Sequence, residues 1–102
     1  MDDVTALLAA ADRIEALAAR TTPGDWRPAG LLASRPEVVA HRAGGGTEHV
    51  AEARAASGAW IAALSPAVAG PLAACLRAAA GASGPVPGEL LNLALVLRGR
   101  LP

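Results

Sequence analysis

The sequence predicts an α+β fold: an N-terminal helix, a small antiparallel β-hairpin or three-stranded sheet, and then two to three Ala/Leu-rich helices. Apolar residues recur at three- and four-residue steps before residue 20 and again after residue 55. Between these segments lies the only part of the chain with strand character, where valines flank a run of three glycines. A chain of 102 residues is expected to form one domain, residues 1–102.

The composition excludes several classes of protein. Apolar residues make up 53% of the chain, with 27 alanines and 14 leucines, which argues against disorder. Nine arginines and nine acidic residues give zero net charge, so a nucleic-acid partner is not expected. One cysteine excludes a disulfide framework and a zinc site built on several thiolates.

The same composition leads to an expected location. A membrane span takes about 20 apolar residues. We identify no stretch of the sequence as long enough, so we predict no membrane partner. The start of the chain, Met1-Asp2-Asp3, is acidic where a signal peptide needs positive charge. We therefore predict a cytoplasmic protein.

The first helix is predicted over residues 3–19. Asp2 or Asp3 can cap its N-terminus, where a negative charge also suits the helix dipole. Thr21-Thr22-Pro23-Gly24 ends it, because a residue before proline avoids the α region and glycine supplies the turn.

The hairpin region is predicted over residues 26–53. Its expected strands are 26–32, 37–42 and 47–53. Pro28 confines the first of these to an edge of the sheet, and Ala43-Gly44-Gly45-Gly46 supplies the turn between the other two. Because an isolated hairpin is only marginally stable in water, we expect it to pack on a helix.

Three further helices are predicted over residues 56–64, 66–80 and 88–98. Ser65 and Pro66 form a good start for the second, with serine as cap and proline at the first position. Pro71 would break a continuous helix at a cost of about 3 kcal/mol, so the helix either kinks there or restarts.

The last helix is apolar on nearly every side. Its candidate interface residues are Leu90, Leu91, Leu93, Leu95 and Leu97. A helix that is apolar all round is buried, and a small domain has little with which to cover one. Either this helix lies centrally between the others, or it is buried against a second chain, so we expect a homo-oligomer or another protein partner.

Three segments carry a resemblance to a known family. Residues 16–27 (ALAARTTPGDWR), 59–68 (AWIAALSPAV) and 93–99 (LALVLRG) resemble, in this order, motifs of the Ead-like proteins. These are small proteins of bacteriophages with many relatives in actinobacterial genomes. Asp25 stands where the family usually has proline, and Trp60 where it has Phe or Tyr. The resemblance implies a helix, a small sheet and then helices, a relation to phages or mobile elements, and no established activity.

The candidate core residues are the few large ones and the cysteine. We expect Trp26 to pack against Trp60 and Ile61, since aromatic side chains bury the largest areas. Leu72 and Cys75 fall on the apolar face of the helix over 66–80, and a free cysteine is usually buried.

The two histidines are the best candidates for chemistry. If Arg42 pairs with Thr47, His41 lies opposite Glu48; if Ala43 pairs with Thr47, His41 faces His49. Two imidazoles are only part of a zinc site, which needs three or four ligands. We therefore interpret them as part of a solvated hairpin face and predict no metal and no cofactor.

No other residues form a catalytic constellation. Glu37, Glu48 and Glu52 are expected to pair with surface arginines. The glycine run lacks the Lys-Ser/Thr of a phosphate-binding loop, and Ser65 lacks a G-x-S-x-G context. The sequence predicts a non-enzymatic interaction module that self-associates. The alternative is a regulatory or nucleic-acid-associated accessory protein that uses the arginines of the hairpin region: Arg27, Arg35, Arg42 and Arg54.

Overall fold

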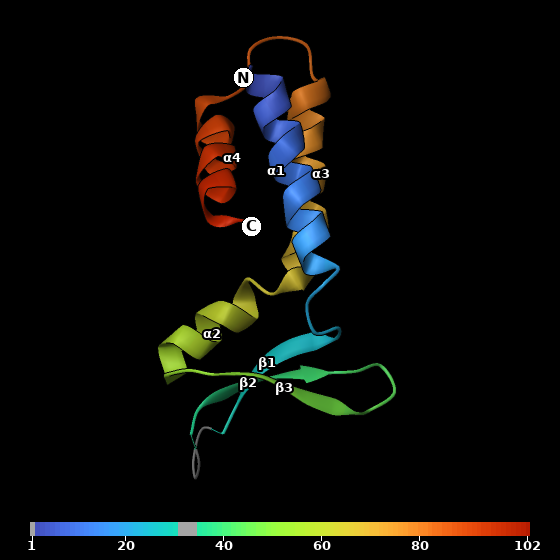
Figure 1. Cartoon of the computed structure of the whole chain (residues 1–102), viewed down its shortest axis with the longest axis vertical. Helices are drawn as coiled ribbons and strands as arrows, with labels where there is room; N and C mark the ends of the chain where they lie inside the picture. Colours follow the sequence, from blue (N-terminus) through green and yellow to red (C-terminus); the bar gives the residue numbers. More distant parts are fainter. Residues whose placement is uncertain (1, 31–34) are drawn as a thin grey trace. The chain divides into compact units, whose positions relative to one another are not determined.

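The computed structural model describes residues 2–30 and 35–102 and confirms the α+β fold (Figure 1). Within these residues, an N-terminal helix is followed by a three-stranded antiparallel sheet and then by further helices. The elements are α1 (Asp3–Ala18), β1 (Asp25–Ala29), β2 (Glu37–His41), β3 (Thr47–Glu52), α2 (Ala55–Ala63), a 3₁₀ turn η1 (Pro66–Val68), α3 (Ala69–Gly81) and α4 (Gly88–Arg100). The part of the predicted first strand that reaches residues 31 and 32 lies outside the described residues.

The chain divides into two compact units. We call residues 1–20 and 68–102 the helical unit, because they hold α1, α3 and α4. Residues 21–67 form the sheet unit, with the three strands and α2. The single domain expected from chain length stays a prediction.

The helical unit has a core made mostly of alanine. The fully buried side chains come from all three helices: Leu7, Ala10 and Ala11 of α1, Ala73 and Leu76 of α3, and Ala94 of α4. Within this unit, α1 lies between the other two helices, and it contacts both far more extensively than they contact each other (Figure 1). The small alanines on these faces let the helix backbones approach closely.

Two polar features support α1. The carboxylate of Asp2 accepts a hydrogen bond from the Thr5 backbone N–H at 2.7 Å, as expected of an N-cap, and this bond lowers the pKa of Asp2. Arg77 of α3 pairs with Asp12 at 2.9 Å and with Glu15, which raises the pKa of Arg77. Since these side chains are exposed, the pairs orient the two helices more than they stabilise them.

Near Pro71 the predicted helix restarts and does not kink. The predicted helix over 66–80 is two elements, because Pro66 begins the short 3₁₀ turn and α3 begins only at Ala69. Pro71 therefore lies in the first turn of α3, where backbone N–H groups have no partner within the helix. In this position proline removes no helical hydrogen bond.

The sheet unit has strand order β1-β2-β3, with both pairs antiparallel. Val38 and Ala40 of the central strand are fully buried. The helix α2 contacts β1 and β2, and its buried Gly58 lies beside Val38 of β2. A Cβ atom at Gly58 would lie 3.8 Å from Cγ2 of Val38, an ordinary van der Waals distance, so the helix packs on the strand and still leaves room for a methyl group at this position. The sheet therefore packs on a helix, as expected from the marginal stability of an isolated hairpin.

Next to the turn, neither of the two predicted hairpin registers is correct. His41 pairs with Thr47, while the backbone N–H of Arg42 donates to the carbonyl of Gly46 at 2.8 Å. The turn between them contains Gly45 at φ +93°, a left-handed conformation that suits the third residue of a three-residue loop. The register then shifts between Val38 and Val39, and beyond the shift Glu37 pairs with Glu52, as in the first predicted register. Turn and bulge together replace the uniform pairing on which both alternatives depended.

Candidate interaction surfaces

The tryptophans have different environments. Trp26 is partly buried on β1, and its ring Nε1 donates to the carbonyl of Thr22 at 2.9 Å. Ile61 is also partly buried. Trp60 was expected in the core, and this is wrong, because 68% of it is exposed. The reason is helical phase: Gly58, Ile61 and Ala62 are the more buried positions of α2, and Trp60 lies about 200° around the helix from Gly58.

Cys75 is exposed, which also contradicts its expected place in the core. The buried residues of α3 are Ala69, Ala73 and Leu76, so the core-facing stripe passes beside Cys75. Leu72 is partly buried and packs against the core of the helical unit, as expected of a core residue.

The candidate interface on α4 divides between two roles. Leu90 and Leu97 pack on the core beside Ala94, and Leu91 is partly buried. The exposed remainder, which we call the α4 surface, consists of Leu93, Leu95 and Val96, of which Leu95 is 50% and Val96 51% exposed. Val96 was not among the candidate interface residues. Its position in the same apolar run of the last helix could have indicated it. Of the two arrangements considered for this helix, the central position belongs to α1 instead.

Other large apolar side chains are exposed away from α4. Val4 and Leu8 are partly exposed on α1, and Leu64, which follows α2, is 56% exposed. Leu64 comes four residues after Trp60, so the spacing itself indicated a shared face.

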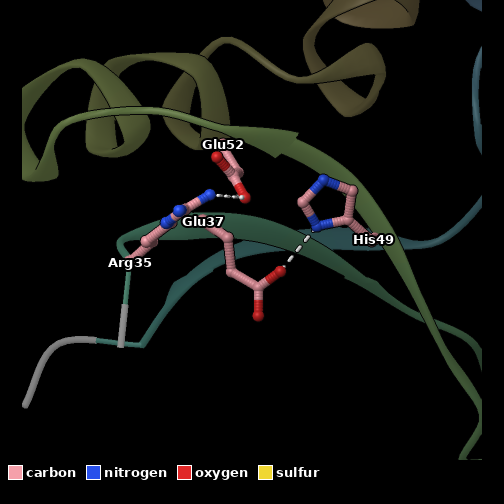
Figure 2. Close-up of polar contacts among 4 residues, drawn as sticks. All are labelled: Arg35, Glu37, His49 and Glu52. Atoms are coloured by element: carbon pink, nitrogen blue, oxygen red, sulfur yellow. Dashed lines mark hydrogen bonds and ion pairs between the residues drawn. The ribbon is translucent and has the colours of Figure 1, made fainter. Parts of the chain in front are cut away.

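A polar cluster lies at the end of the sheet where β2 begins and β3 ends (Figure 2). His49 Nδ1 lies 2.6 Å from Glu37 Oε2, which joins the two strands. Arg35 Nη1 lies 3.6 Å from Glu52 Oε1. Arg35, His49 and Glu52 are well exposed and Glu37 is partly exposed, so the cluster resembles the solvated face expected from the sequence more than a catalytic site.

The histidines are not brought together. His41 lies opposite Asp25 on one side and Thr47 on the other, while His49 lies opposite Val39. Among the described residues, no group of three or more His, Cys, Asp or Glu side chains could hold a metal ion.

A depression of about 400 Å³ adjoins the polar cluster. It is lined by Arg35, Pro36, Glu52, Ala53, Arg54 and Ala55. Its volume is in the range of small-molecule sites, but such sites usually enclose their ligand. This depression is wide open to solvent, and two of its charged residues already pair with each other.

The arginines of the sheet unit are balanced by acids. Arg27 pairs with Asp25 at 2.7 Å, Arg42 pairs with Glu48, and Arg35 approaches Glu52. Four arginines and four acidic residues occur between residues 21 and 67, so this segment has no net charge. Phosphate binding depends on an excess of positive charge, so these pairs do not favour the alternative nucleic-acid role.

One apolar stretch is longer than expected from the sequence. The helical stretch over residues 55–81 has 27 residues and is long and apolar enough, by length and composition alone, to cross a membrane. This corrects the expectation that no such stretch exists. It is weak evidence, because core helices of soluble proteins meet the same criteria, and Ala69, Ala73 and Leu76 are buried within the protein. The cytoplasmic location stays a prediction.

Comparisons with known proteins add no assignment. No protein-family model, no curated protein and no solved structure matches this chain. The resemblance to the Ead-like proteins therefore stays a prediction from the three motifs.

Proposed function

We propose that this chain is a small non-enzymatic interaction module that self-associates through the α4 surface. The observation that supports the proposal is the exposure of Leu93, Leu95 and Val96 on one short helix. Consecutive residues lie about 100° apart on a helix, so Leu95 and Val96 form an adjoining apolar area on the side away from Ala94. In a symmetric dimer each copy would cover the same area of the other.

The size of this area predicts a weak dimer. Full burial of a Leu or Val side chain stabilises by about 1.5–3 kcal/mol, so a half-exposed one would gain roughly 1 kcal/mol. The gain from both copies is comparable with an association cost of about 4 kcal/mol or more. Because the gain and the cost nearly cancel at the 1 M standard state, we expect a weak dimer whose population rises only at about millimolar protein concentrations and above.

Light scattering coupled to size-exclusion chromatography tests this proposal. The full chain should increase in mass with concentration, and the double variant Leu95→Glu/Val96→Glu should remain a monomer. Charge at these positions should disrupt the interface without reaching the core, since both side chains are half exposed in the monomer. Far-UV circular dichroism would check that the variant keeps its helices.

Leu64→Glu is the matched control. Leu64 is a leucine of similar exposure that belongs to the sheet unit and not to the unit that holds α4. It should leave the concentration dependence unchanged. A wild-type chain that stays monomeric throughout, or a Leu64→Glu variant that dissociates while the α4 variant does not, would overturn the proposal.

We also propose that the module is related to phages or mobile elements. The support is the resemblance of residues 16–27, 59–68 and 93–99 to the Ead-like motifs, and the order of elements that this resemblance implies. The neighbouring genes test this proposal: genes for integration or phage replication beside this one are expected, and a conserved housekeeping neighbourhood would contradict it.

A further inference from the structure

We draw no further inference here: the strongest candidate, the exposed apolar face of helix α2 around Trp60 and Leu64, carries nothing because nothing in the structure shows what covers it.

Discussion

The helical unit and the sheet unit bury their large side chains differently. Three helices surround Leu7 and Leu76 completely in the helical unit. In the sheet unit, Val38 is the largest fully buried side chain among the described residues, and the larger Trp60 is exposed. The difference teaches that a short helix on a small sheet buries the side that its phase presents, here the side of Gly58, rather than its largest residue.

The largest effect is expected in the helical core. Leu76→Ala should destabilise the protein by about 2–5 kcal/mol, because it removes a fully buried side chain and leaves a cavity. Chemical denaturation followed by circular dichroism measures this loss. Both tryptophans lie in the sheet unit, so their fluorescence follows that unit separately. If the chain unfolds as one domain, both signals shift together.

Cys75→Ala is the control for this experiment. The two positions are neighbours on α3, but Cys75 is exposed. Its substitution should change stability by less than about 0.5 kcal/mol. Equal destabilisation by both variants would contradict the assigned core of α3.

Two glycines of the sheet unit should respond in opposite directions. Gly24 has φ +117°, and a Cβ atom there would lie 2.8 Å from the backbone oxygen of His41, so Gly24→Ala should cost more than about 1 kcal/mol. Gly58 lies in a helix with ordinary contact distances around the added atom. Gly58→Ala should therefore gain roughly 0.5–1 kcal/mol of helix stability. Thermal unfolding of both variants measures these changes in stability. A destabilised Gly58→Ala protein would show that α2 packs more tightly on the sheet than described.

The polar cluster should contribute less than either core. A double-mutant cycle on Glu37→Gln and His49→Gln should give a coupling of about 0.2–1 kcal/mol, since the His49 side chain is exposed and that of Glu37 is partly exposed. The cycle is measured by denaturation near pH 6. A coupling of several kcal/mol would indicate a desolvated pair and would reopen the cluster as a functional site.

The smallest effect concerns the cap of α1. The pKa of Asp2 is lowered by the Thr5 N–H, so its stabilisation is present above the unfolded value near 3.8 and is lost as pH falls through the lower folded value. Asp2→Ala should therefore lower Tm slightly at pH 7 and match the wild-type Tm in stronger acid. Asp2→Asn, which keeps an acceptor at this position, is the control. A Tm difference that is the same at both pH values would contradict the capping role.

Much of the fold could be predicted because local patterns determine it. The apolar spacing in residues 3–19 gave α1 to within one residue, and Pro28 correctly indicated an edge strand. The hairpin register could not be predicted, because it depends on the left-handed Gly45 and on a shift beside Val38, and neither follows from strand propensity.

The errors in the candidate core have a common physical cause. Trp60 was placed in the core by residue type, and Cys75 by residue type and by an apolar face that included it, while in the structure the angle around α2 and α3 leaves both exposed. Alanine-rich helices make this angle hard to predict, because alanine is compatible with a buried or an exposed position. On α4, by contrast, Leu90 and Leu97 take the buried side because they follow the same stripe as Ala94.

The hairpin tip has a practical consequence for studying this protein. An added Cβ at Gly44 or Gly45 would meet no atom within 4 Å, so the turn projects freely from the sheet unit. Exposed tips made of small residues accept inserted peptides with little loss of stability. An epitope or fluorophore-binding tag between Ala43 and Gly44 would enlarge the loop that the Arg42–Gly46 backbone hydrogen bond closes, and would label the chain far in sequence from the α4 surface.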